Sequence, residues 1–324
     1  MPVPTVGIAG ITGRLARLIT HHLLALNPSL TIKGYCRDAS KTFSSPILSS
    51  SNNHPHNITI AHGDPYDPTA LRHFVSGCDV VICAFHGDHR LMTEGQRLLI
   101  EACEAEGVKR YVAGDWTLDY DKLEYGQHPQ KDAQKIVKGY LQEEGRRVRG
   151  VHILIGIFYE TFWSDYFGVF RHGCDGVGEA FTYWGTGDEV WEGVSYDDAA
   201  RYTAEVALDG EAVGVLAFLG DRKSTKQLAA EFGEVYSVTP TMKCLGTVEE
   251  LHTEMKATRE KEPGNIFAWL AENYQAYILN GQTYVSTNDN GRYPNVKPAT
   301  FKEFLQKYKV EDLNGLYTKA AEDL

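Results

Sequence analysis

Three glycines near the start of the chain have the spacing of a phosphate-binding turn. Gly7, Gly10 and Gly13 form a G-x-x-G-x-x-G pattern between an apolar run and residues with helical spacing. We expect Gly7 to permit a tight turn, Gly10 to let the backbone approach a pyrophosphate, and Gly13 to let the helix pack closely on the strand. Free N–H groups and the positive end of that helix would hold the phosphates. The residues expected to bind the cofactor here are Gly7, Gly10, Ile11, Thr12, Gly13 and Arg14.

The residues after the second predicted strand indicate which dinucleotide is bound. Arg37 directly follows the strand predicted at 31–36, and Lys41 lies one turn later. Two cations at this point would pair with the 2′-phosphate of NADP, whereas an acidic side chain would accept hydrogen bonds from the ribose of NAD. Asp38 could contact a ribose, and solvated loop charges are the alternative. The sequence favours NADP(H).

Further cofactor contacts are expected at the carboxyl ends of the other predicted strands. Asp64 follows the third strand, where it either binds an adenine amino group or closes a turn, and both roles stay open. The ends of the fourth, fifth and sixth strands should also border the cofactor. Those residues are Ala84, Phe85, His86, Gly114, Gly156 and Phe158.

Polar side chains after the fifth predicted strand could move protons. They are Asp115, Thr117, Tyr120, Lys131 and Lys135. A typical short-chain dehydrogenase has Tyr-x-x-x-Lys here, in which the lysine lowers the pKa of the tyrosine. That pair is absent, because no lysine stands four residues after Tyr120. Lys131 or Lys135 could still place an ammonium over the cofactor, and a solvated helix face is the alternative.

Aromatic residues gather after the sixth predicted strand, in 158–170 and 181–191, well above the 11% average of the chain. Substrates of open α/β sheets bind beyond the carboxyl ends of the strands. We therefore expect a wall for a flat substrate, with pure core as the alternative. Its residues would be Trp116, Tyr159, Trp163, Phe167 and Trp184.

Strands and helices alternate through residue 155, which predicts an α/β fold with a Rossmann-type, doubly wound parallel sheet. We expect residues 1–156 to form this NAD(P)-binding domain and 195–220 to return to it. Residues 157–324 would add a smaller, interleaved C-terminal substrate region. His152, within the apolar sixth strand, is predicted to be a hydrogen-bonded core histidine rather than a catalyst.

Composition limits the function classes. The chain has 324 residues, 43% of them hydrophobic, and a net charge of −11, which argues against binding nucleic acid or anionic membranes. No apolar run has the length of a membrane span, and no secretory signal precedes the first strand. The six cysteines are scattered without a C-x-x-C pair, so we expect reduced thiols, no metal site and a cytoplasmic location.

With these features the chain resembles the NmrA-like family of atypical short-chain dehydrogenases, relatives of the isoflavone reductases. The segments that carry the resemblance are Gly7 to Gly13, Arg37 to Lys41, Gly63-Asp64, Gly107 to Tyr111 and Gly156 to Glu160. Tyr183 to Gly187 and Asp197-Asp198 are similar to the fungal branch of that family. The resemblance implies NADP(H) binding, and some members reduce small aromatic metabolites in natural-product pathways. Others act as redox sensors that bind regulatory proteins.

The chain departs from the reductase pattern at one position. Isoflavone reductase-like enzymes carry a lysine in the helix after the fifth strand, and matching on Val137 and Tyr140 places Gln134 there. Lys135 is one residue away and Lys131 nearly one turn away, so lysine-assisted hydride transfer is in doubt.

Two functions therefore compete. In the first, the protein transfers a hydride between NADP(H) and a small aromatic or heterocyclic metabolite, or uses the cofactor for an isomerisation or cyclisation. In the second, it is a non-catalytic NADP(H) sensor with a protein partner. The aromatic density favours the enzyme, and the missing Tyr-x-x-x-Lys favours the sensor. The sequence does not define the substrate, the direction and stereochemistry of hydride transfer, or the oligomeric state.

Overall fold

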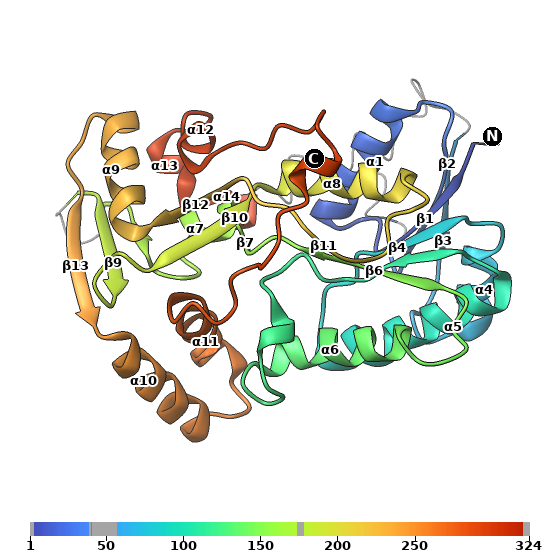
Figure 1. Cartoon of the computed structure of the whole chain (residues 1–324), viewed down its shortest axis with the longest axis horizontal. Coiled ribbons are helices and arrows are strands. Elements are labelled where there is room, and N and C mark those ends of the chain that lie inside the picture. Colours follow the sequence, from blue (N-terminus) through green and yellow to red (C-terminus); the bar gives the residue numbers. More distant parts are fainter. Residues whose placement is uncertain (1–2, 39, 41–56, 174–177, 320–324) are drawn as a thin grey trace.

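The computed structural model describes residues 3–38, 40, 57–173 and 178–319. They form a seven-stranded sheet with helices on both faces, joined to a second region with two small sheets (Figure 1). None of the helices within these ranges is both long and apolar enough to cross a membrane. No cluster of potential metal ligands is present in the same ranges.

The large sheet is parallel throughout, with the order β11-β6-β5-β4-β1-β2-β3. Its strands are β1 (Thr5–Ala9), β2 (Thr31–Cys36), β3 (Ile58–His62), β4 (Val80–Cys83), β5 (Arg110–Val112), β6 (Arg149–Leu154) and β11 (Gly214–Ala217). From β1 the chain proceeds to β2 and β3 on one side of the sheet. It then crosses to β4, which lies on the other side of β1. Doubly wound folds bind ligands beyond the carboxyl ends of the strands at such a change of direction, here those of β1 and β4, and we call this place the crevice. The predicted Rossmann-type fold is confirmed.

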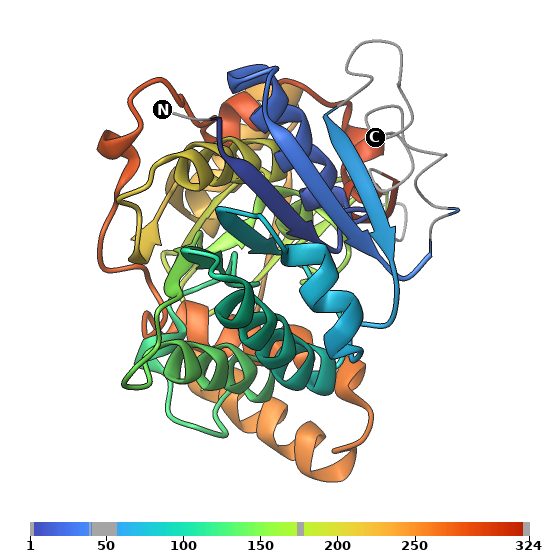
Figure 2. The same ribbon diagram turned by 90° about the vertical axis from the view of Figure 1, so that its right-hand side faces the viewer.

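Helices cover both faces of this sheet (Figures 1 and 2). On one face α1 (Arg14–Leu26) packs against α8 (Tyr196–Leu208). On the other lie α4 (Pro68–Val75), α5 (Gln96–Glu106) and α6 (Pro129–Leu141), with the π-helical turn η1 (Leu91–Gly95) leading into α5. Within 195–220, the segment expected to return to this domain, β11 pairs with β6 in the sheet and α8 packs on α1.

Side-chain caps explain where several helices begin. Asp67 accepts hydrogen bonds from the N–H groups of Thr69 and Ala70 at the start of α4. Ser195 accepts one from the N–H of Asp198 at the start of α8. Such caps satisfy first-turn N–H groups that have no partner inside the helix. Helix α1 has no side-chain cap, and neither do α5 and α6.

The C-terminal region contains two three-stranded sheets, β12-β10-β7 and β13-β9-β8. Their strands are β7 (Ile157–Phe158), β8 (Phe170–Arg171), β9 (Ala180–Trp184), β10 (Val190–Val194), β12 (Asp221–Ser224) and β13 (Thr241–Gly246). The helices of this region are α7 (Tyr159–Trp163), α9 (Thr225–Tyr236), α10 (Val248–Lys261), α11 (Leu270–Leu279), α12 (Phe301–Leu305), α13 (Val310–Leu313) and α14 (Leu316–Lys319).

The aromatic stretch after β6 forms the core of this region and not an open wall. Tyr159 and Trp163 are fully buried, and Trp163 packs against the rings of Phe170, Phe181 and Phe232. Phe167 and Trp184 belong to the same core and are less than one-tenth exposed. These four residues therefore have the burial of core side chains, which was the alternative to a substrate wall.

Candidate functional site

The turn between β1 and α1 is held tightly against two neighbouring strands. Gly10 has a φ of +80°, and a Cβ at this position would lie 2.6 Å from the carbonyl oxygen of Ala84, just beyond β4. The N–H groups of Gly10 and Ile11 both donate to the carbonyl of Tyr35 in β2, at 2.8 and 3.3 Å. Only glycine fits this conformation and this close approach at position 10.

The N-terminus of α1 has the features of an anion site. No side chain caps it at Gly13, and its first turn contains no acidic residue. The first N–H groups of a helix lack intrahelical partners and carry partial positive charge. An uncapped helix that starts at a glycine turn beside the crevice fits a dinucleotide diphosphate.

Two glycines do not have the predicted roles. Gly7 lies inside β1, where a Cβ would meet Cys78 Sγ and Val81 Cγ2, each at 3.1 Å, so it serves packing and not the turn. At Gly13 a Cβ would meet only the carbonyl oxygen of Gly10, at 3.3 Å, so Gly13 does not mediate packing of the helix on the strand. Ala16 is the small residue that α1 buries completely at its first turn.

The residues predicted to select NADP lie at the end of β2. Arg37 directly follows β2, is exposed, and forms no ion pair with another described residue. Asp38 accepts hydrogen bonds from the backbone N–H and the hydroxyl of Ser40 at 2.9 and 2.6 Å. Lys41 lies outside the described residues. Arg37 is thus positioned beside the crevice with its guanidinium available.

Asp64 has the contacts of a turn residue. Its Oδ1 accepts a hydrogen bond from the N–H of Tyr66 at 2.9 Å, and its carbonyl accepts one from the hydroxyl of Tyr35 at 2.8 Å. These bonds match the turn alternative. The adenine role stays a prediction.

The other strand-end residues predicted to border the cofactor come from several elements. Ala84 meets Gly10, and Phe85 and His86 follow it beyond β4. The N–H of Gly114, after β5, donates to Gln96 Oε1 at 3.1 Å. After β6, Gly156 has a φ of +68° and a Cβ there would lie 2.2 Å from the carbonyl oxygen of Glu192, so it permits close contact with β10. The ring of Phe158 stacks on Tyr196 with centroids 3.7 Å apart.

Asp115, Tyr120 and His152 form a buried hydrogen-bonded network beneath the crevice. Asp115 Oδ2 lies 2.7 Å from His152 Nδ1 and accepts a hydrogen bond from the Tyr120 hydroxyl at 3.1 Å. Burial, together with the nearby Asp115 carboxylate, raises the pKa of Tyr120 far above its usual value. Tyr120 is therefore a poor proton donor, and its burial argues against its predicted catalytic role. His152 has the partner expected of a core histidine.

We expect this network to contribute mainly to stability. Asp115→Ala should lower the free energy of unfolding by about 3 kcal/mol, because it leaves the buried Tyr120 hydroxyl and His152 ring without a partner. Tyr120→Phe removes one hydrogen bond and should cost about 1 kcal/mol. Urea denaturation measures both. Equal losses for the two variants would contradict the network.

The lysines of α6 point in different directions. Lys131 is 5% exposed, its ammonium lies 5.1 Å from the ring centroid of Tyr274, and it forms no hydrogen bond or ion pair with another described residue. By contrast, Lys135 donates to the carbonyl of Leu123 and lies over the ring of Tyr125. Of the two predicted lysines, only Lys131 has a buried ammonium free for a ligand.

Burial lowers the pKa of Lys131 to about 8, although the Asp115 carboxylate opposes this shift. Partial burial and then the charge of Lys131 lower the pKa of His86, at the end of β4. The Lys131 ammonium is therefore close enough to Asp115, which follows β5, and to His86, which follows β4, to interact electrostatically with both. A buried ammonium with a pKa near neutrality is suited to proton transfer.

Two residues around Lys131, His128 and Tyr274, were not recognised in the sequence. Gln134, which the resemblance places where the reductases carry a lysine, and the predicted site residue Thr117 lie near them. Gln134 is 6% exposed, and its Oε1 is buried without a hydrogen-bonding partner among the described residues. The same holds for both ring nitrogens of His128, whose ring lies 4.3 Å from that of Tyr274. Thr117 is buried and pairs with Leu154 of β6 in an isolated parallel bridge, and its side chain lies at the Tyr274 hydroxyl. Tyr274 belongs to α11, far along the chain, and no local pattern marks it.

Trp116 is buried next to this site and does not present an open surface to a substrate. Its backbone has a φ of +36°, an uncommon conformation for a large side chain. Its indole N–H donates to the Thr203 hydroxyl of α8 at 2.9 Å, and the side chain is 8% exposed. Strained backbone next to Asp115 is typical of a functional site.

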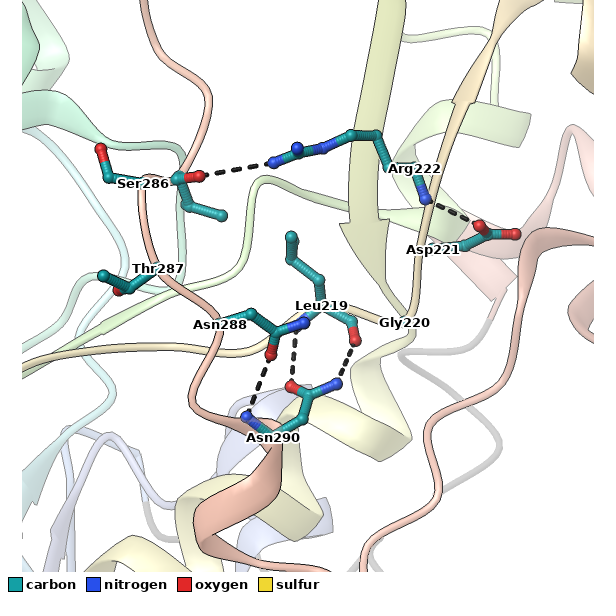
Figure 3. A pocket seen from close by; sticks show the side chains of 9 residues that line it. Leu219, Gly220, Asp221, Arg222, Ser286, Thr287, Asn288 and Asn290 are labelled. Atoms are coloured by element: carbon teal, nitrogen blue, oxygen red, sulfur yellow. Dashed lines mark hydrogen bonds between the residues drawn. The ribbon is translucent and has the colours of Figure 1, made fainter.

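A separate surface hollow of about 370 Å³ lies beyond β11 (Figure 3). It is lined by Leu219 to Arg222, Val285 to Asn288, and Asn290. The Asn290 side chain bonds both backbone groups of Leu219, and Arg222 binds Glu192 and the carbonyl of Val285. These polar groups are already paired with each other, so we do not assign the site here.

Comparisons with known proteins support a nucleotide-binding domain that includes the turn before α1. Residues 10–149 match the family model for NAD(P)H-binding domains. No curated protein matches the sequence. Similar solved structures include an isoflavone reductase (18% identity, TM-score 0.76, covering 95% of this chain and 100% of the other). A leucoanthocyanidin reductase–NADPH complex from Vitis vinifera has 16% identity and a TM-score of 0.75, covering 94% and 99%.

A third structure, AtPrR2 with NADP+ and (+)pinoresinol, has 16% identity and a TM-score of 0.74, covering 95% of this chain and 100% of that one. At these identities the likeness shows a shared fold over nearly the whole length. The resemblance to the fungal branch stays a prediction.

Proposed function

We propose that this chain, whose residues 10–149 form an NAD(P)H-binding domain within the fold of the isoflavone, pinoresinol and leucoanthocyanidin reductases, is an NADP(H)-dependent reductase of small aromatic metabolites. The observation that carries this proposal is the Lys131 ammonium, which is buried and unpaired among the described residues, beside a crevice that begins with an uncapped helix. The domain expected to bind the cofactor thus also carries, in Lys131, a group able to donate a proton.

Different residues of the crevice would bind different parts of NADPH. The turn from Gly10 to Arg14 would hold the diphosphate, and Arg37 would pair with the 2′-phosphate. The segments after β4 and β5 would border the nicotinamide end. When bound, NADPH supplies a hydride to an electrophilic carbon of the substrate.

Lys131 would complete the reaction by giving a proton to the substrate atom on which negative charge develops. Its ammonium is held in a buried position, where a positive charge stabilises an anion more strongly than in water. Tyr274 and Tyr166 lie near Lys131 and are only partly buried. Their rings therefore offer surface to a flat substrate. The proposed aromatic contacts thus come from α7 and α11 regions and not from the buried tryptophans.

The Arg37 guanidinium gives a direct test of cofactor choice. Arg37→Met should weaken NADPH binding about 10- to 100-fold, because a charge-assisted pair with the 2′-phosphate is lost. NADH binding should change by less than about threefold, since NADH lacks that phosphate. Calorimetric titration measures both constants. An equal loss for both nucleotides would mean that the 2′-phosphate binds elsewhere.

A further inference from the structure

The last described helix, α14, contacts Arg14, the first residue of α1. Arg14 donates a hydrogen bond from one terminal nitrogen to the carbonyl of Leu316 at 2.9 Å. The two residues are 302 positions apart in the sequence. The element proposed to bind the diphosphate is therefore in direct contact with α14.

Arg14 is held on several sides but keeps one donor free. Its guanidinium lies 4.3 Å above the ring of Tyr196, and its second terminal nitrogen is 3.6 Å from Glu160 Oε1. Its Nε is buried and has no hydrogen-bonding partner among the described residues. A buried N–H group without a partner is costly unless a ligand accepts its hydrogen bond.

The C-terminal segment, which we define as Leu313 to Tyr317, is also anchored independently of Arg14. The side chains of Leu313 and Leu316 are buried in the core of the C-terminal region. Asn314 donates a hydrogen bond to Asp165 Oδ1 at 2.8 Å. The segment is therefore a packed part of the structure.

The same segment lies beside aromatic rings near Lys131. The ring of Tyr317 lies 6.1 Å from that of Tyr166, which in turn lies 6.4 Å from Tyr274. Tyr317 is 40% exposed, so one face of its ring is open. The C-terminal segment therefore touches both the proposed diphosphate site, through Arg14, and the rings proposed to pack on the substrate, through Tyr317.

We propose that the C-terminal segment is a wall of the active site that bound NADPH stabilises, with Arg14 as the link between them. The diphosphate accepts a hydrogen bond from Arg14 Nε, which fixes the guanidinium and thereby its bond to the Leu316 carbonyl. Tyr317 then becomes the outer aromatic surface against which a flat substrate packs. This inference rests on the proposed function, because it requires NADPH to bind at the α1 turn.

Amide hydrogen exchange of the full chain with and without NADPH tests the link. NADPH should slow exchange in peptides covering 10–18, which report cofactor binding. It should also slow exchange in peptides covering 313–319 by about tenfold, the scale of coupling between two sites. In Arg14→Met, at a saturating NADPH concentration, protection should persist at 10–18 and be lost at 313–319. Arg72→Met, which changes an exposed arginine of α4, should behave like the wild type.

The outcomes separate the two proposals. Protection at 10–18 with unchanged or faster exchange at 313–319 would overturn the link and leave the proposed function standing. Absence of protection at 10–18 would overturn both. Retained protection at 313–319 in NADPH-saturated Arg14→Met would show that Arg14 is not the link.

Discussion

Replacing Lys131 with methionine is expected to lower kcat for NADPH-dependent reduction by about 100- to 10,000-fold, the range attributed to general acid catalysis. Methionine keeps the length of the side chain but has no proton to donate. The dissociation constant of NADPH should change by less than about threefold, because the other proposed binding groups stay in place. Initial rates of NADPH oxidation and a separate NADPH titration measure the two quantities.

Two controls distinguish Lys131 from its neighbours and from a purely structural effect. Lys135→Met should leave kcat unchanged, because the Lys135 ammonium binds the Leu123 carbonyl and lies over Tyr125. In the wild type, kcat should fall as the pH rises through about 8, since the ammonium is the acid and burial lowers its pKa to about 8. In Lys131→Arg that fall should disappear, because arginine stays protonated. Comparable losses in the Lys131 and Lys135 variants would remove Lys131 from the mechanism.

Gly10→Ala is expected to weaken NADPH binding by more than about 100-fold and to lower the free energy of unfolding by about 2–4 kcal/mol. The added Cβ would lie 2.6 Å from the carbonyl oxygen of Ala84, and the φ of +80° is unfavourable for alanine. The turn must therefore move away from β4, which displaces the start of α1. Calorimetric titration and urea denaturation measure the two effects.

Gly107→Ala provides a matched control for this substitution. Gly107 has a φ of +75°, close to that of Gly10, but a Cβ there would have nothing within 4 Å. It should therefore show only the conformational cost of about 1 kcal/mol and normal NADPH binding. If Gly10→Ala binds NADPH as Gly107→Ala does, the glycine turn is not the diphosphate site.

The sheet could be predicted from the sequence because its signals are local. Short apolar strands alternate with amphipathic helices, and each pattern is visible within a few residues. The roles of the individual glycines were harder to predict from the sequence. The apolar run Val6, Ile8 and Ala9 predicts the strand, but the spacing of the glycines does not show which of them forms the turn. Gly7 lies inside β1, and the turn is at Gly10.

The rest of the site depends on contacts between distant parts of the chain. Trp163 is buried by Phe232 of α9, so its burial was not visible in its own aromatic stretch. The bond between Asp115 and His152 spans 37 residues, and the one between Arg14 and Leu316 spans 302. The orientation of Lys131 likewise depends on how α6 packs, because Lys131 and Lys135 are one helical turn apart and equivalent by spacing.

The most direct test of the central claim is a parallel titration of the wild-type protein with NADPH and NADH, followed by NADPH oxidation assays with planar enones, imines, ketones and quinones. We predict that NADPH binds at least about tenfold more tightly than NADH, the effect of one charge-assisted phosphate pair, and is oxidised with a member of the panel. Tight NADPH binding without oxidation would contradict the reductase and favour a cofactor sensor. Failure to bind either nucleotide would contradict the assignment of the crevice itself.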